Sequence, residues 1–510
     1  MTRPADALPD DPDLLKAMLL AERAESDRLR QIIKELQRHR FGRRAESLPA
    51  DQLQLALEEV EQVEAAGEAD SEQKTPAERR ARGAKRRANR GALPVHLARI
   101  ETVVDVESRI CPCCAGNLHR IGEDVGERLD IVPAQFRVLV MRRPKYGCRV
   151  CQEVVVQAPA PARLIEGGLP TEATVAQVLV SKYADHLPLY RQAQIYARQG
   201  VGLDRSTLAD WVGRAAFLLR PVQERLFDQL KTSPKLFADE TTAPVLDPGR
   251  GQTKTGQLFA YVRDDRPWGG SDPPGVVYRY APDRKAERPI AHLAGYCGVL
   301  QVDGYGGYKV LARQNAVQLA FCWSHVRRRF YELAQSGPAP IATEALARIA
   351  ALYRIEAEIS GKRPEERRAI RQQHSRPLVE AFHPWLRAKL ALISQKTRLA
   401  EAIRSALSRW DGLCLFLDDG RVEIDNNTVE RAIRPLALNR KNALFAGSDG
   451  GAEHWAVIAS LIETCKLIGV DPHAYLADII TRIVNGHPQS RLDKLLPWAY
   501  SVTSPLRDVA

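Results

Sequence analysis

A chain of 510 residues is too long for one ordinary hydrophobic core, and its length predicts roughly three to four domains. Hydrophobic residues make up 45% of it, which is enough for folded domains and excludes a wholly disordered protein. The 74 Lys and Arg against 63 Asp and Glu give a net charge of +11, which favours a polyanionic partner. No apolar stretch approaches the roughly 18 residues that cross a bilayer, and the acidic start is not that of a signal peptide. We therefore expect a cytoplasmic protein with no membrane contact.

The first segment, residues 1–70, is expected to form a leucine-rich helical region resembling a coiled coil. Leu15, Leu29 and Leu36 share one heptad position, whereas Glu22 occupies the slot between the first two. A coiled coil that joins copies of the chain is one interpretation. An amphipathic helix docked on its own protein is the other.

Residues 71–98 are expected to be an exposed linker, because eight basic residues within 74–90 face a single acidic one. Such a charge run suits contacts with phosphate groups, which supply affinity without sequence preference. A solvated linker without any DNA contact is the alternative. The residues expected to bind DNA here are Arg79, Arg80, Arg82, Lys85, Arg86 and Arg87.

Residues 99–160 contain two Cys-x-x-Cys pairs, Cys111 with Cys114 and Cys148 with Cys151. In a reducing compartment two such pairs predict a structural Zn²⁺ site, because each presents two thiolates to one side of a tetrahedral ion. Cys113 is a spare thiol, and only the spacing assigns Cys111 and Cys114 in its place. Reduced cysteines that merely pack are the alternative.

Residues 165–225 carry apolar residues at helical spacing, interrupted by the turn at 200–202. A helix, a glycine-containing turn and a second helix are compatible with a helix-turn-helix that binds DNA. They fit an ordinary helical hairpin equally well.

Residues 230–335 change character to short β-rich runs, expected at 235–239, 257–263, 276–280, 299–303 and 317–322, with a helix at 285–295. Three strands, a helix and two further strands follow the order of a ribonuclease H-like mixed sheet. In that order Asp239 lies on the first strand and Asp303 at the end of the fourth, so the two would be neighbours in space.

The remainder of the chain is expected to be mainly helical. Residues 336–418 are expected to form a helical insertion, 419–470 the second part of the same core, and 471–510 a small appendage. Glu430 lies in the second part, within a segment that reads as the start of a helix. Asn427 is expected to cap that helix, and Arg434, on the face of Glu430, could hold either the glutamate or a DNA phosphate.

Asp239, Asp303 and Glu430 are the candidate catalytic residues. Each has an ordinary structural explanation by itself: a solvated strand end, a turn dipeptide and a capping box. Together they match a site for Mg²⁺, which takes hard oxygen ligands, and two such ions stabilise the attacking and leaving oxygens of an in-line displacement. A nucleic-acid phosphodiester is the expected substrate.

Nearly the whole chain resembles the transposases of the insertion sequence 66 family. The resemblance rests on long stretches in the right order, which are specific in combination. They are Phe41–Glu46, the two cysteine pairs, Ser181–Arg191, Ser206–Trp211, Asp303–Tyr305, Cys322–Arg328, Asn426–Arg431, and Arg440–Asn442 through Gly447–Ser448.

The resemblance implies an RNase H-like DDE transposase with the triad at Asp239, Asp303 and Glu430. It implies catalysis with two Mg²⁺ ions, for which Mn²⁺ can substitute, on double-stranded DNA at the terminal inverted repeats of its element and at a target. A structural Zn²⁺ site, a leucine-zipper-like segment, self-association and cooperation with other proteins of the same element are implied too. Cys322 and His325 match a Cys-x-x-His motif whose role stays open between packing and function.

Two other classes of protein remain as alternatives. A nuclease of the same fold would hydrolyse DNA without strand transfer. A non-catalytic, zinc-containing DNA-binding protein would keep its function when the triad is changed.

Overall fold

The computed structural model describes residues 168–500 apart from 248–251, 315 and 336, together with parts of 136–165 and positions 75, 77 and 81. The chain divides into two units, residues 1–133 and 134–510, and everything below concerns the second. The expected leucine-rich segment, the basic linker apart from positions 75, 77 and 81, and the four predicted zinc ligands lie outside the described residues. Within the described part, no helix is long and apolar enough to span a bilayer.

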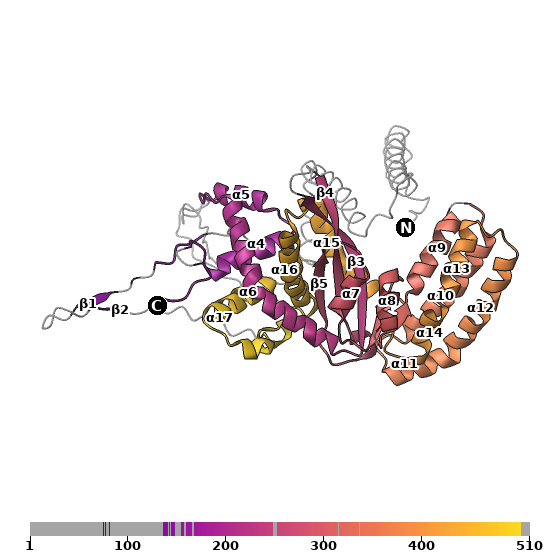
Figure 1. Ribbon diagram of the computed structural model, residues 1–510. Helices are drawn as coiled ribbons and strands as arrows, with labels where there is room; N and C mark the ends of the chain where they lie inside the picture. Colours follow the sequence, from indigo (N-terminus) through magenta and orange to yellow (C-terminus); the bar gives the residue numbers. More distant parts are fainter. Residues whose placement is uncertain are drawn as a thin grey trace, which may run out of the picture. The chain divides into compact units, whose positions relative to one another are not determined.

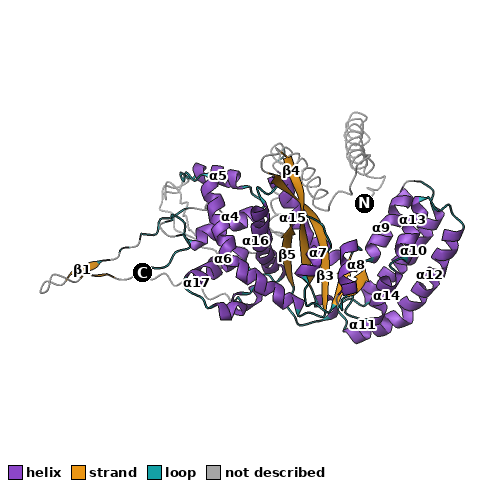
Figure 2. Ribbon diagram, viewed as in Figure 1, coloured by secondary structure: helices purple, strands orange, loops and turns teal. Residues whose placement is uncertain are grey.

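A five-stranded mixed sheet forms the centre of the second unit (Figures 1 and 2). Its strands are β3 (Lys235–Asp247), β4 (Gln252–Arg263), β5 (Gly275–Ala281), β6 (Val299–Val302) and β7 (Gln318–Phe321). Their order across the sheet is β5-β4-β3-β6-β7, with β3–β4 and β4–β5 antiparallel and β3–β6 and β6–β7 parallel. This is the ribonuclease H-like topology, and it confirms the predicted fold class and strand order.

The expected strands are found, with ends that differ from the prediction. β3 and β4 form a longer hairpin than the apolar runs indicated, since β3 continues for eight residues beyond Asp239. The crossover helix α7 is shorter than expected, Glu287–His292, and α8 (Gly306–Gln314) follows β6. The hairpin extends because its register continues from Phe237–Val262 to Asp247–Gln252 without interruption.

Helices cover the sheet and share its hydrophobic core. They are α4 (Glu172–Tyr183), α5 (Leu189–Arg198), α6 (Arg205–Lys231), α15 (Asn427–Ala443), α16 (Asp449–Leu467) and α17 (Pro472–Val484). Figure 1 shows α16 beside the sheet with α4, α6 and α17 beyond it. Short 3₁₀ segments at Arg266–Trp268, Gln489–Leu495 and Pro497–Ala499 complete this part.

The predicted hairpin at 165–225 consists of α5 and α6, joined by a turn in which Gly200 adopts φ +80°. α6 is much longer than a recognition helix requires, and it buries one side along its length, from Leu208 to Leu230. Gln223 on α6 donates a hydrogen bond of 3.0 Å to the carbonyl of Tyr278 on β5. The hairpin of α5 and α6 thus packs into the core of the five-stranded sheet. That this hairpin binds DNA stays a prediction.

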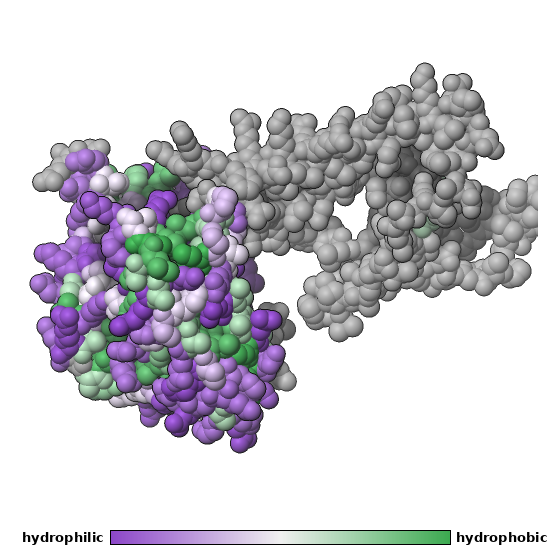
Figure 3. All heavy atoms as spheres, turned by 90° about the vertical axis from the view of Figure 1, so that its right-hand side faces the viewer, coloured by the Kyte–Doolittle hydropathy of each residue, from purple (hydrophilic) through white to green (hydrophobic). Residues whose placement is uncertain are grey.

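A second hydrophobic core belongs to the helical insertion. Its helices are α9 (Trp323–Gln335), α10 (Pro340–Glu358), α11 (Pro364–Ile370), a π-helical turn (Arg371–Ser375), α12 (Arg376–Ala391), α13 (Arg398–Leu407) and α14 (Trp410–Asp418). Figure 3 views the molecule from this side and shows a mostly hydrophilic surface interrupted by hydrophobic areas. Tyr331, Leu378 and Leu392 are exposed large hydrophobic residues of this region.

Two fully buried arginines of the insertion are paired, and one of them, Arg367, joins the insertion to the segment before α15. Arg367 forms a bidentate pair with Glu423 at 2.9 and 3.0 Å, and Arg371 pairs with Glu356 at 2.8 and 2.6 Å. Buried guanidinium groups require such partners, because an unpaired buried charge is strongly destabilising. The insertion is therefore fixed to the chain that leads into Glu430.

A separate two-stranded antiparallel sheet consists of β1 (Lys145–Gly147) and β2 (Val155–Gln157). These strands flank the predicted zinc ligands Cys148 and Cys151 in the sequence.

Candidate active site

The parallel pair β3–β6 brings the first two candidate carboxylates to one edge of the sheet. Its register pairs Lys235 with Val299 and Phe237 with Gln301, so two further residues bring Asp239 level with Asp303. Neighbouring strands lie about 4.8 Å apart. The residues that precede each carboxylate are fully buried in the core, which fixes the strand ends.

Asp303 stands at a sharp turn immediately after β6. Its carboxylate accepts a 2.9 Å hydrogen bond from the N–H of Tyr305, and Gly304 between them adopts φ +115°. A side chain is strained at such an angle, so glycine allows the turn. The turn holds the Asp303 side chain at the edge of the sheet where β3 passes.

Glu430 reaches the same edge of the sheet from α15. Gln301 on β6 holds the segment that leads into this helix. The fully buried Gln301 amide donates to the carbonyls of Glu423 and Asp425 at 2.7 and 2.6 Å and accepts from the N–H of Glu423 at 3.2 Å. Asn426 adds a long bond of 3.4 Å to the carbonyl of Ala238, next to Asp239. The first turn of α15, which carries Glu430, is therefore held next to Ala238 and Gln301, the residues that come shortly before Asp239 and Asp303.

The expected cap of this helix is wrong by one residue. Asn426 is the N-cap and makes no side-chain capping bond, whereas Asn427 is the first helical residue and donates to the Asp425 carboxylate at 2.7 Å. The segment 423–426 is held by tertiary bonds, so the helix start does not need a local cap. Arg434 lies one turn beyond Glu430 and is half-buried.

The charges of Asp303 and Glu430 both act on Asp239. The pKa of Asp239 is raised to about 8, mainly by burial, and the charges of Asp303, Glu240 and Glu430 contribute to the same rise. The N–H of Glu240 opposes the shift by donating to Asp239 at 2.8 Å. Mutual repulsion of buried carboxylates is the condition that a bound divalent cation relieves. This donor set of hard oxygens fits Mg²⁺ or Mn²⁺.

Glu240 is a buried carboxylate that sequence reasoning missed as part of the site. It accepts hydrogen bonds from the Arg284 guanidinium, at 2.8 Å from Nε, and from the Tyr308 hydroxyl at 3.1 Å. Successive strand residues point to opposite faces, so Glu240 and Asp239 serve different faces of the sheet. Arg284 already compensates Glu240, which leaves Asp239 as the carboxylate of this pair that is suited to a metal.

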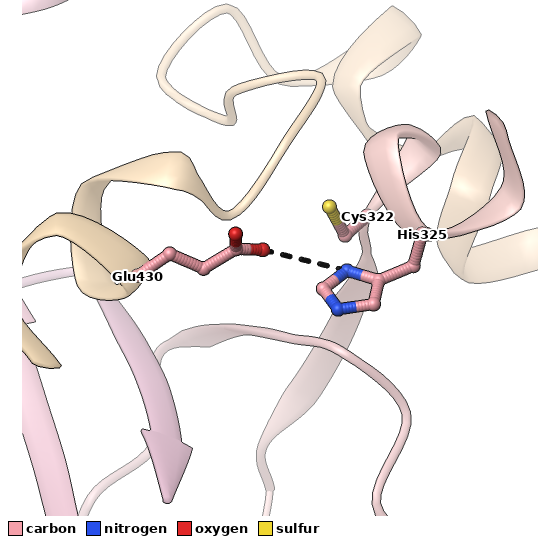
Figure 4. A group of neighbouring side chains, drawn as sticks. All are labelled: Cys322, His325 and Glu430. Atoms are coloured by element: carbon pink, nitrogen blue, oxygen red, sulfur yellow. Dashed lines mark ion pairs between the residues drawn. The ribbon is translucent and has the colours of Figure 1, made fainter. Parts of the chain in front are cut away.

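The Cys-x-x-His motif lies beside Glu430 (Figure 4). His325 Nδ1 is 3.7 Å from Glu430 Oε1, and Arg328 of the same helix is 3.8 Å from Oε2. These distances are ion-pair contacts and are too long for hydrogen bonds. Burial lowers the pKa of His325 while the charges of Glu430 and Asp303 oppose that shift. His325 thus borders the carboxylate cluster.

Cys322 has a mainly structural setting. Its sulfur accepts the N–H of Asn426 at 3.2 Å, and burial raises the pKa of the thiol to about 12. It therefore joins the end of β7 to the segment that precedes α15. The ligand atoms of Cys322, His325 and Glu430 lie within 4.8 Å of one another, so a metal ion could also be held there. Packing accounts for Cys322, whereas His325 faces the carboxylates.

The remaining predicted site residues lie outside the described part of the chain. They are Arg79, Arg80, Arg82, Lys85, Arg86 and Arg87 of the linker, and Cys111, Cys114, Cys148 and Cys151 of the expected zinc site.

Comparison with protein families gives four matches in chain order. Residues 28–102 match "Transposase C of IS166 homeodomain", and 108–152 match "zinc-finger binding domain of transposase IS66". Residues 167–454 match "Transposase IS66 family", and 460–498 match the "IS66 C-terminal element". The zinc-finger match spans both cysteine pairs, and the transposase match spans all three carboxylates.

Relatives of the same length occur in Sinorhizobium fredii. The protein y4qI is 44% identical over 98% of this chain and 99% of its own length, and y4jD is 44% identical over 97% of each. Among solved structures, the Mos1 transposase paired-end complex with left transposon end covers 48% of this chain and 79% of its own, at 13% identity and a TM-score of 0.13. That score is too low to carry a structural argument.

The sheet topology and the family match over residues 167–454 agree, and the chain belongs to the IS66 transposase family, the DDE-type polynucleotidyl transferases.

Proposed function

We propose that this transposase binds the terminal inverted repeats of its element and catalyses DNA cleavage and strand transfer with Asp239, Asp303 and Glu430. The observation that carries the proposal is the convergence of these residues at one edge of a ribonuclease H-like sheet, where Asp303 and Glu430 both raise the pKa of Asp239. The reaction is an in-line displacement at phosphorus. Water first releases a 3′ hydroxyl at the element end, and that hydroxyl then attacks a target phosphodiester.

Asp239, Asp303 and Glu430 would hold two Mg²⁺ ions, because a bound divalent cation relieves the repulsion that Asp303 and Glu430 exert on Asp239. Bound divalent ions would lower the pKa of the attacking hydroxyl and stabilise charge on the leaving oxygen. Mn²⁺ would substitute, since it accepts the same oxygen ligands. The protein's own contribution is to fix the carboxylates, through Gln301 and the Asp303 turn, before DNA arrives.

Basic residues around the site would bind the DNA backbone. Arg328 stands 3.8 Å from Glu430 with its side chain 58% exposed, so it can turn towards a phosphate once a cation compensates the glutamate. Arg434 lies on the same helix as Glu430 and would also contact a DNA phosphate. The basic linker at 71–98 would add contacts that do not depend on sequence.

The module at 99–160 would hold one structural Zn²⁺ through Cys111, Cys114, Cys148 and Cys151. Support comes from the zinc-finger match at 108–152 and from the hairpin β1–β2, whose strands flank the second pair. The leucine-rich segment at 1–70 would join copies of the chain, as a reaction that brings two element ends together needs. Other proteins of the same element remain candidate partners.

The test replaces Asp303 with Asn in the full-length protein and uses duplexes taken from the DNA that flanks the gene. Asp303→Asn should still bind the element end, should lose cleavage and joining, and should bind Mn²⁺ more weakly in a titration without DNA. Asp493→Asn is the matched control, because this exposed carboxylate pairs with Arg225. Full joining by Asp303→Asn would remove Asp303 from the site. Cleavage without joining in the wild type would favour a nuclease.

A further inference from the structure

The loop that follows α15 contains a strained turn centred on Leu444. This residue has φ +64° and ψ −52°, and the N–H of Phe445 donates a 2.7 Å hydrogen bond to the carbonyl of Ala443. These values define a γ-turn of the rare, positive-φ kind, which is unfavourable for a residue that has a Cβ atom. Such strain persists only where the surrounding structure imposes it.

The hydrogen bonds that follow the turn hold Leu444 in this strained conformation. Ala446 is joined to β3 by two backbone hydrogen bonds of 2.9 Å, one to the carbonyl of Pro244 and one from the N–H of Leu246. Ser448 then caps α16 by accepting the N–H of Gly451 at 3.0 Å. The turn is therefore fixed at both ends, between a helix that enters it and a strand that holds it.

The turn presents two large apolar side chains to solvent. Leu444 is 66% exposed and Phe445 is 44% exposed. Neither fills the core of the described part, so the folded chain gains little from them in return for the strain. Strained backbone together with exposed apolar side chains is typical of a binding site.

The position of the turn identifies its partner. Leu444 lies fourteen residues beyond Glu430 along α15, a distance of about 21 Å at 1.5 Å per residue. Val245, which bridges to Ala446, lies six residues beyond Asp239 along β3, about 20 Å at 3.3 Å per residue. DNA that runs along α15 from the carboxylates would thus bring its bases to the turn after about six base pairs at 3.4 Å each.

Charge next to the turn favours the same partner. Arg440 and Lys441 lie in the last turn of α15, and Lys441 is exposed. A cation beside an apolar tip matches a nucleotide, which offers a phosphate beside the flat face of a base. A protein partner would not explain why the tip stands on the same helix and strand as the carboxylates.

We propose that Leu444 and Phe445 form a base-binding wedge, which packs against a base unstacked from the DNA duplex about six base pairs from the scissile phosphate. The proposal rests on the proposed function, because it takes the DNA held at the carboxylates as the ligand. The wedge holds the duplex in a distorted form and fixes its register on the protein. Phe445 stacks on the base, and Leu444 fills the gap that the base leaves.

The test uses the full-length protein in the Asp303→Asn background, which prevents cleavage. Element-end duplexes carry 2-aminopurine at one position at a time, over about ten base pairs from the cleavage site. The wild-type wedge should increase the fluorescence at one position about six base pairs away, because an unstacked 2-aminopurine is no longer quenched by its neighbours. Phe445→Ala should lose this increase and bind the end about tenfold more weakly.

Three further variants separate a wedge from a structural role. Phe445→Trp keeps an aromatic face and should preserve end binding. Leu444→Gly should weaken the signal without lowering the melting temperature, because glycine adopts positive φ freely. Leu392→Ala removes a still more exposed leucine from the insertion and should change nothing.

The outcomes distinguish this inference from the proposed function. An unchanged 2-aminopurine signal in Phe445→Ala, or no signal at any position when wild-type protein is bound, would overturn the wedge even if joining proceeds. A changed assembly state in Phe445→Ala with an unchanged signal would identify the tip as a protein contact and would overturn it as well. A wedge signal in the Asp303→Asn background, together with a wild-type protein that binds the end but cannot join it, would leave the wedge and refute strand transfer.

Discussion

Replacement of Gln301 by Ala tests whether Glu430 is positioned from the sheet. The Gln301 amide is fully buried and makes three hydrogen bonds to the backbone of residues 423–425. At about 0.5–1.5 kcal/mol for each bond, Gln301→Ala should lower the free energy of unfolding by about 2–4 kcal/mol. Because these bonds lead into α15, the Glu430 carboxylate should lose its place beside Asp239. A displacement of about 1 Å can slow a reaction roughly a hundredfold.

The assay measures joining of a labelled element end at saturating Mg²⁺, together with chemical denaturation of the same preparation. We expect Gln301→Ala to lose about a hundredfold in joining rate at temperatures where it is fully folded. Gln223→Ala is the matched control, because Gln223 is equally buried and donates one 3.0 Å bond to Tyr278 on the far strand β5. It should lose about 1 kcal/mol and keep its rate. A destabilised Gln301→Ala that still joins ends at the wild-type rate would refute the reasoning.

Three other predictions concern stability and metal content. Burial lowers the pKa of Lys235 from 10.5 to about 8 in the folded chain. Below pH 8 the charged Lys235 therefore lowers the free energy of unfolding by roughly 3 kcal/mol, and this loss disappears as the pH rises to 10.5. Lys235→Met should therefore be more stable than the wild type at pH 7 in denaturant titrations, with a difference that shrinks towards pH 10; a difference that grows instead would contradict the shift. Gly304→Ala should lower the melting temperature and the joining rate, since Gly304 has φ +115° and a Cβ there would lie 2.6 Å from the Arg409 guanidinium; wild-type values in both assays would speak against a strained turn. Cys148→Ser should lose the bound zinc, measured by atomic absorption, whereas Cys113→Ser should keep it; equal loss in both would show that spacing chose the wrong thiol.

The positions of the candidate carboxylates could be predicted from local sequence. Short β-rich runs placed Asp239 on a strand and Asp303 at the end of another, and the segment around Glu430 indicated a helix start. These patterns are local, because side-chain alternation and helical spacing depend only on near neighbours. The order of strands and helix then restricted the sheet to few topologies.

The extent of β3 could not be predicted in this way. The sequence predicted a strand that ends at Asp239, because the β-rich run covers only 235–239. The strand continues to Asp247 because it stays paired with β4, and Ala446, 202 residues beyond Pro244, adds a hydrogen bond from its N–H to the Pro244 carbonyl. A partner so distant leaves no trace in the local pattern.

Sequence alone thus determined that Asp239 lies on a strand, that Asp303 follows one and that Glu430 lies in the first turn of a helix, since near neighbours fix those features. Only the tertiary structure decided that Gln301 fastens the approach to Glu430, that Arg284 compensates Glu240, and that His325 faces Glu430. It also decided that Leu444 adopts a strained turn. These contacts join residues far apart in sequence, so they exist only once the sheet register and the packing of the insertion are complete.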